Sequence, residues 1–129
     1  MNAEGIVSLW ISEDADAGTV ERAFLDDYSE DGDWIPHPFA SAFGFTHLNP
    51  STCEANALNA STTSVREAVE GFSYASLIGE RFARVLGENL PSRARSIVLL
   101  YDLAYSGTLA SAIVAGATWT FVGSVRYLP

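Results

Sequence analysis

The apolar run from Ser96 to Asp102, which reads SIVLLYD, constrains the fold more than any other segment of the chain. A short run of this kind, rich in large aliphatic residues, is typical of a buried β-strand. Residues 5–12 are also largely apolar on both faces and predict a second, central strand. Residues 118–127 alternate between apolar and polar side chains, which predicts a third strand.

Apolar residues recur at helical spacing in three other segments of the chain. They predict helices over residues 17–28, 65–70 and 74–88. In the first of these helices, the apolar stripe would run from Val20 to Tyr28 and face the core. The stripe therefore predicts that Tyr28 is a buried residue.

Two segments show neither pattern. Residues 49–63 are rich in Asn, Ser, Thr and Ala and are interpreted as an irregular connection, and no element is predicted for residues 106–116. Counting the two longer helices, the recognised elements follow one another in the order β-α-α-β-β. They predict a single α+β domain over residues 1–129, with a small mixed or antiparallel sheet of three to four strands and helices packed on one face.

The negative charge of the chain is concentrated at its beginning. The first 33 residues hold ten acidic residues against one arginine, whereas the other 96 hold six acidic residues and six arginines, and the net charge is −9. A charge imbalance confined to one segment makes a directional field that favours a basic partner. It speaks against nucleic acid or an anionic membrane as a ligand, because both need Lys or Arg to neutralise phosphate.

The densest part of this acidic segment is followed directly by a tryptophan. An aromatic residue beside a charged patch is common at protein interfaces. The residues predicted to contact a partner are Asp26, Asp27, Glu30, Asp31, Asp33 and Trp34. A second interpretation of Trp34, in which it folds back over the core as a lid, stays open at this point.

Neither a calcium loop nor a transition-metal site is predicted. Asp27–Gly32 resembles the first half of a calcium loop, but Pro38 stands where the loop needs a bidentate glutamate. His37, His47 and Cys53 lack the spacing of metal ligands. The acidic turn is therefore interpreted as a solvated turn.

The cysteine content, the start of the chain and the length of its apolar runs bear on the location of the protein. Cys53 is the only cysteine, so no intramolecular disulfide can form, which fits a reducing cytoplasm. The chain begins without the pattern of a signal peptide, and its apolar runs are too short to cross a bilayer. A cytoplasmic location is expected.

Two other classes of function stay open. The chain could be a small enzyme that uses Asp102 together with His37 or His47, in which case these groups should converge in one pocket. It could also be a homo-oligomeric binding module built on the strand over residues 118–127.

Short motifs across nearly the whole chain resemble one protein family. They are Val7-Ser8-Leu9-Trp10, Pro38-Phe39 leading to Phe43-Gly44, Gly71-Phe72-Ser73-Tyr74, Val98-Leu99-Leu100-Tyr101-Asp102 with Tyr105, and Phe121-Val122-Gly123-Ser124 with Tyr127. In these motifs the chain resembles the immunity protein 22 family of bacterial polymorphic toxin systems. The resemblance implies a small cytoplasmic α+β protein that binds and neutralises a cognate toxin, with no cofactor and no enzymatic activity. A nuclease toxin would match an acidic inhibitor, because its substrate cleft is positively charged.

Overall fold

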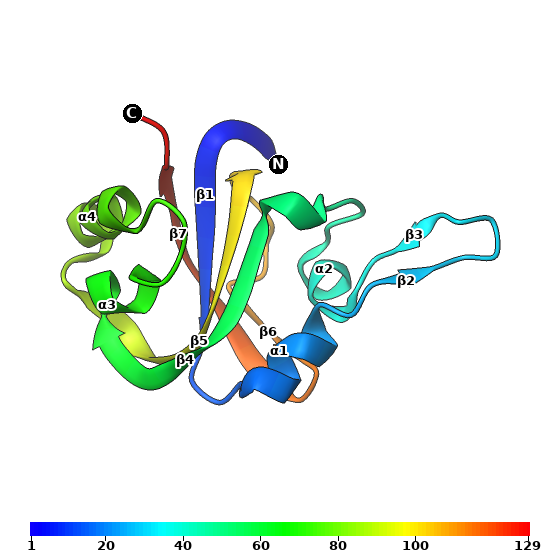
Figure 1. The fold of residues 1–129 in the computed structure, drawn as a ribbon, viewed down its shortest axis with the longest axis horizontal. Coiled ribbons are helices and arrows are strands. Elements are labelled where there is room, and N and C mark those ends of the chain that lie inside the picture. Colours follow the sequence, from blue (N-terminus) through cyan, green and yellow to red (C-terminus); the bar gives the residue numbers. More distant parts are fainter.

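A curled, five-stranded antiparallel sheet forms the centre of the structure, a computed structural model that describes residues 1–129 (Figure 1). The strand order is β4-β5-β1-β7-β6. These strands are β1 (Asn2–Ser12), β4 (Cys53–Ser64), β5 (Asn89–Leu103), β6 (Ser111–Val114) and β7 (Ala117–Arg126). A separate hairpin pairs β2 (Asp27–Tyr28) with β3 (Trp34–Ile35).

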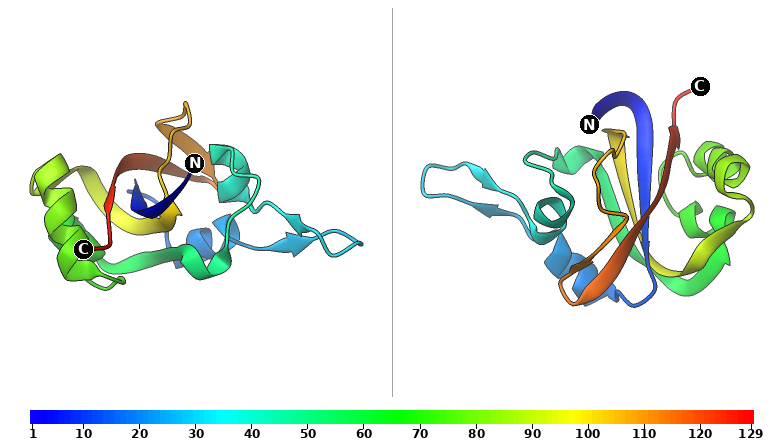
Figure 2. Two further views of the ribbon diagram at one scale, coloured as in Figure 1. Left: turned by 90° about the horizontal axis from the view of Figure 1, so that it is seen from above. Right: turned by 180° about the vertical axis from the view of Figure 1, so that it is seen from behind.

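Helices cover both faces of the sheet. The helices are α1 (Ala17–Ala23), α2 (Pro38–Phe43), α3 (Val65–Val69) and α4 (Ala75–Leu86), and a 3₁₀ turn, η1 (Pro50–Thr52), precedes β4. Figure 2 shows α3 and α4 on one side of the sheet and α1 and α2 on the other. The alternation of side chains along β1 explains this arrangement, because Leu9 faces the core beneath α3 and α4 whereas Trp10 faces the core beneath α1 and α2.

The predicted fold class, a sheet of three to four strands with helices on one face, is wrong. β1 and β5 are apolar on both faces, and each face needs its own cover: Leu99 packs in the core with α3 and α4, and Val98 packs in the other. The additional strands lie in the two segments where no strand was predicted, residues 49–63 and 106–116. β4 and β6 are the two edge strands, so their polar residues remain partly exposed and show no clear alternation.

The first helix is shorter than predicted. Asp16 begins α1 by accepting a hydrogen bond from the Thr19 amide at 2.8 Å, but α1 ends at Ala23, not at residue 28. Acidic residues near a helix C-terminus face the negative end of the helix dipole, which disfavours continuing the helix into Asp26 and Asp27. Tyr28 therefore lies in β2 and is 57% exposed, so the prediction that it is buried is wrong.

The register of β7 with β1 shifts once, so residues two, four or six positions apart along β7 do not all face the same core. Trp10 of β1 lies opposite Phe121, whereas the neighbouring Leu9 lies opposite Gly123. The irregularity changes which face of β7 each side chain occupies, so Trp119 packs in the same core as Trp10 and Val125 packs beneath α4.

None of the helices has both the length and the apolar character needed to span a membrane.

Candidate partner-binding site

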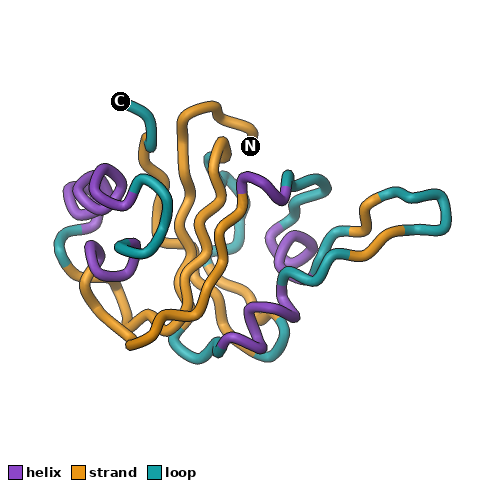
Figure 3. The backbone as a smooth tube through the Cα atoms, in the orientation of Figure 1, coloured by secondary structure: helices purple, strands orange, loops and turns teal.

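Residues 25–36 form a hairpin that projects from the body of the protein, and this hairpin is called the arm below (Figure 1; Figure 3). Its turn is closed by two backbone hydrogen bonds, from the Ser29 amide to the Asp33 carbonyl at 2.8 Å and from the Gly32 amide to the Ser29 carbonyl at 2.9 Å. Gly32 has a φ of +84°, a conformation that glycine adopts without strain. The sequence at the tip therefore folds as a defined turn.

The five acidic residues predicted to bind a partner all lie on the arm, and all are exposed. Asp26 accepts a hydrogen bond from the Trp34 indole nitrogen at 2.8 Å, and Asp27 accepts one from the Tyr28 amide at 2.8 Å. The ion pairs of the structure are Arg66–Glu88 and Arg84–Glu80, which involve α3, α4 and the residue just before β5. No arginine lies within ion-pair distance of an arm carboxylate, so the arm presents its negative charge to solvent.

Other acidic residues of the first segment have structural roles in the body of the protein. Asp14 accepts hydrogen bonds from the Ser12 hydroxyl at 3.0 Å and from the Thr118 amide at 3.2 Å. The bond from the Thr19 amide at the start of α1 holds the pKa of Asp16 below its usual value. Asp14 and Asp16 thus fix local structure, Glu4, Glu13 and Glu21 are exposed on the body of the protein, and the other five carboxylates of the segment lie on the arm.

Trp34 lies at the base of the arm and is half-buried. Its ring meets the rings of His37 and His47 edge-on, at centroid distances of 5.5 and 6.2 Å, and it packs against the core beneath α1 and α2. The hydrogen bond to Asp26 fixes the indole in this position. The side chain thus covers the core with one edge and leaves another edge at the surface of the arm.

Sequence reasoning missed three exposed apolar residues in the arm. Leu25 is 64%, Tyr28 57% and Ile35 42% exposed. Tyr28 pairs with Trp34 across the hairpin, so the two aromatic side chains share one face of the arm. The signal that could have located the hairpin is the dipeptide Asp31-Gly32 between short apolar segments, which is typical of hairpin turns.

His37 joins the arm to α2. It is 5% exposed, and its Nδ1 atom accepts a hydrogen bond from the Ala40 amide at 3.0 Å, which begins α2. The ring also packs against Phe24 at a centroid distance of 4.7 Å. Burial lowers the pKa of His37, and the nearby Asp26 carboxylate opposes this effect in part.

We expect His37 to make the stability of the protein fall in mild acid. A folded-state pKa below the ordinary value of 6.5 means that folding favours the neutral ring. The contribution of the neutral ring to stability is complete above pH 6.5, and it is lost as the pH falls through the lower pKa of His37 in the folded protein. Urea unfolding at pH 7.5 and 5.5 measures the free energy of unfolding of the wild type and of His37→Asn, in which asparagine can cap α2 without titrating. This free energy should fall less between the two pH values in the variant than in the wild type. Equal losses in both proteins would contradict this role for His37.

The groups of the enzyme alternative do not converge. Asp102 accepts hydrogen bonds from the Gly5 amide at 3.0 Å and the Tyr127 hydroxyl at 2.6 Å, and these bonds hold its pKa below the usual value. His37 caps α2, and His47 packs against Trp34. No hydrogen bond joins Asp102 to either histidine. The carboxylate fixes the end of β5 against β1 and β7.

Cys53 has no features of a reactive thiol. It is partly buried at the start of β4, and its thiol lies 3.4 Å from the Asn49 carbonyl oxygen. Burial raises the pKa of the thiol to about 11, so the neutral form predominates near pH 7. The structure places no group of three His, Cys, Asp or Glu side chains so that it could hold a metal ion.

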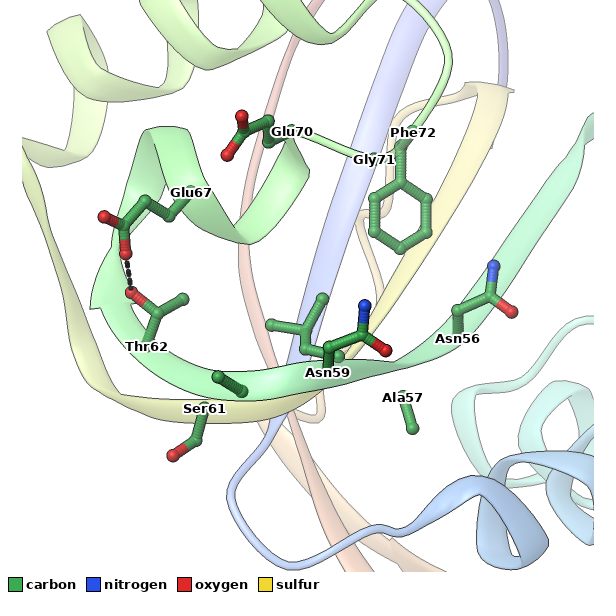
Figure 4. Close-up of a pocket in the computed structure, with 11 residues that line it drawn as sticks. Asn56, Ala57, Asn59, Ser61, Thr62, Glu67, Glu70, Gly71 and Phe72 are labelled. Atoms are coloured by element: carbon green, nitrogen blue, oxygen red, sulfur yellow. Dashed lines mark hydrogen bonds between the residues drawn. The ribbon is translucent and has the colours of Figure 1, made fainter.

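A hollow of about 560 Å³ lies away from the arm between β4 and α3 (Figure 4). Asn56 and Asn59 line it from β4, and Glu70 and Phe72 line it from the opposite side. The Thr62 hydroxyl donates to the Glu67 carboxylate at 2.8 Å across its end. No residue of the arm and neither histidine lines this hollow.

β7, the strand on which the homo-oligomer alternative was based, lies between β1 and β6 in the sheet. β1 pairs with it from Ile6 to Ile11, and β6 pairs with its first residues. The strand therefore forms part of the central sheet, unlike the projecting arm.

Comparison with known proteins gives one match. A protein-family model described as Immunity protein 22 matches residues 7–127, which include the whole arm and nearly all of the sheet. Searches of curated proteins and of solved structures gave no significant match.

Proposed function

The chain belongs to the Immunity protein 22 family, so its role in general is that of an immunity protein, and we propose that it neutralises a cognate bacterial toxin by placing the acidic arm on a basic surface of that toxin. The contacts that we propose are the residues predicted from the sequence, Asp26, Asp27, Glu30, Asp31, Asp33 and Trp34. No catalysis and no cofactor enter this proposal. Inhibition results from occlusion of the toxin surface, in the cytoplasm.

The observation that carries the proposal is the exposure of five carboxylates on one projecting hairpin, with no arginine in ion-pair distance of them. Like charges concentrated on one protrusion attract an oppositely charged surface from a distance and orient it before contact. Such steering raises association rate constants, and screening by salt weakens it. The arm is therefore suited to fast capture of a basic protein.

The apolar side chains of the arm supply the interactions that slow dissociation. Tyr28 is exposed and lies beside the fixed indole of Trp34, and Ile35 lies on the opposite face. Aromatic residues that become fully desolvated in an interface contribute a large share of the binding energy. Electrostatic attraction would thus set the association rate, and burial of these side chains would set the lifetime of the complex.

A nuclease is the toxin class that best fits this charge. Nucleases bind phosphate through Lys and Arg, so their substrate clefts are positively charged. An acidic arm that enters such a cleft would compete with the substrate for the same basic residues. The sequence of the arm supports this class through its charge alone.

The proposal is tested with the toxin domain encoded next to the gene for this chain. Isothermal titration should give a one-to-one complex with a Kd below about 10⁻⁷ M, the range of stable protein complexes of standard size. One equivalent of the chain should abolish toxin activity, and co-expression should protect cells. Absence of a complex, or full toxin activity at saturating concentrations of the chain, would show that the proposal is wrong.

A further inference from the structure

A second surface feature has the chemistry of a binding site and lies outside the arm. It is a hollow of about 340 Å³ at the end of the sheet, and it is called the tyrosine hollow below. Its walls include Thr52, Glu54, Ser73, Tyr74, Tyr101 and Tyr127. The fold brings these residues together from η1, the start of β4, the residues just before α4, the end of β5 and the residue just after β7.

Three tyrosine rings pack against one another in this hollow. The ring centroid of Tyr127 lies 5.0 Å from the centroid of Tyr74 and 5.0 Å from that of Tyr101. The centroids of Tyr74 and Tyr101 are 6.1 Å apart. Tyr101 and Tyr127 are buried, whereas Tyr74 is 52% exposed. The two inner rings therefore support the ring of Tyr74 from behind and leave part of it available to a ligand.

A fixed carboxylate stands beside these rings. Glu54 accepts hydrogen bonds from three donors: the Ser73 amide, which reaches both carboxylate oxygens at 3.1 and 3.4 Å, the Ser73 hydroxyl at 3.2 Å and the Tyr101 hydroxyl at 2.5 Å. These bonds orient the carboxylate at the start of α4. A carboxylate offers about four acceptor positions, so Glu54 can accept a further hydrogen bond.

The lining of the hollow is negative, and the Arg81 guanidinium nearby donates to the carbonyl oxygens of Arg126 and Leu128, on either side of Tyr127. An adjoining hollow of about 390 Å³ shares Thr52 and Tyr101 with it and adds the carboxylates of Glu4 and Asp102. No arginine lines either hollow. The hydrogen bond to Asp102 raises the pKa of Tyr127 to about 12, and burial together with Glu54 raises the pKa of Tyr101.

From this geometry we propose that the tyrosine hollow binds the guanidinium group of an arginine side chain presented by the toxin. A guanidinium group is planar and weakly hydrated, so it stacks on an aromatic ring while its N–H groups donate to a carboxylate. Tyr74 offers the ring, and Glu54 offers the acceptor. The identity of the partner rests on the proposed function, whereas the chemistry of the hollow does not depend on it.

The chemistry is tested by NMR titration of the full chain with N-acetyl-L-argininamide as the probe. The neutral isostere N-acetyl-L-citrullinamide is the matched control. We expect saturable shifts of the Ser73 and Tyr74 amide signals with the arginine compound at millimolar concentrations, and none with the citrulline compound. Equal shifts with both compounds, or no saturable shift with either, would overturn the inference.

Variants locate the interaction. Tyr74 has a φ of +59°, so Tyr74→Gly removes the ring while glycine adopts the backbone conformation without strain. Affinity for argininamide should fall by roughly threefold to fivefold, the size expected for a cation–π contact at an exposed site. Tyr74→Phe keeps the ring and should keep the affinity, and Glu54→Gln should weaken it. Val85→Ala, an exposed position on α4, should leave it unchanged. An unchanged affinity in Tyr74→Gly would contradict the inference.

Binding to the toxin domain separates this inference from the proposal for the arm. Tyr74→Gly should weaken toxin binding by a similar factor whether or not the arm acids have been neutralised. If Tyr74→Gly leaves toxin affinity unchanged, the hollow is not a toxin contact, and the arm proposal is unaffected. If neutralising the arm has no effect, the arm proposal fails, and the result for the hollow stands.

Discussion

Neutralising the five carboxylates of the arm should lower the association rate constant for the toxin by about 10-fold to 1000-fold at low ionic strength. The variant carries Asp26→Asn, Asp27→Asn, Glu30→Gln, Asp31→Asn and Asp33→Asn. Each substitution keeps an oxygen that accepts hydrogen bonds, so Trp34 retains a partner at residue 26 and the hairpin should still form. Stopped-flow association with the toxin domain measures the effect.

A control with a matched change in charge separates the effect of the arm on the association rate constant from the effect of the net charge of the protein. The triple variant Glu30→Gln, Asp31→Asn, Asp33→Asn is compared with Glu70→Gln, Glu80→Gln, Glu88→Gln. The control acids lie on or beside α3 and α4, and the exposed pairs that two of them form contribute little to stability. Association should slow in the arm variant and change little in the control. Equal slowing in both variants would mean that overall charge, and not the arm, drives the encounter.

Replacing Trp10 with alanine should destabilise the fold by about 3–5 kcal/mol, the range for removal of a fully buried large aromatic side chain. Trp10 is fully buried, and its ring centroid lies 5.2–5.6 Å from those of Phe39, Phe43, Tyr105 and Phe121. The substitution leaves a cavity where β1, α2 and β7 meet. Urea unfolding followed by circular dichroism measures the loss.

Trp10→Phe is the matched control for this cavity. The indole nitrogen of Trp10 is buried and has no hydrogen-bond partner, so its loss removes no hydrogen bond. The phenyl ring fills most of the space, and the cost should be clearly smaller than for alanine. A cost below about 1 kcal/mol for Trp10→Ala would contradict the view that this ring organises the core beneath α1 and α2.

The central elements of the fold could be predicted because their signal is local. The apolar runs at residues 5–12 and 96–102 lie within β1 and β5, and the alternating segment 118–127 corresponds to β7. Helix α4 lies within the predicted residues 74–88. In β1 and β5 the apolar run reflects burial on both faces, and in β7 and α4 the periodicity reflects burial of one face.

The edge strands and the second helical layer could not be predicted in this way. β4 lies at the edge of the sheet, so Asn56 and Asn59 stay exposed and give the segment the composition of a loop. The cover on both faces follows from the burial of Val98 and Leu99 on opposite sides of β5, a pattern that the sequence presents as one apolar run. The missing information is which elements pack on each face, and it depends on tertiary contacts.

The candidate site shows the same division. The charge excess of residues 26–33 is evident in the sequence, and the carboxylates lie exposed on the arm. The hairpin itself was missed because Tyr28 continues the helical spacing of the residues before it. The exposure of the apolar side chains of Leu25, Tyr28 and Ile35 follows from the end of α1 at Ala23, which the helical spacing of the sequence does not indicate.

The ionic-strength dependence of the association rate constant, measured for the wild-type chain and for the five-fold neutralised variant, tests the role of the arm most directly. We expect association of the wild-type chain to slow by at least about tenfold between low and high salt, because screening shortens the range of the arm's field. The variant should show a nearly flat dependence. If the rate constants of the two proteins fall equally with salt, the arm does not steer the toxin, and the proposed mechanism is wrong.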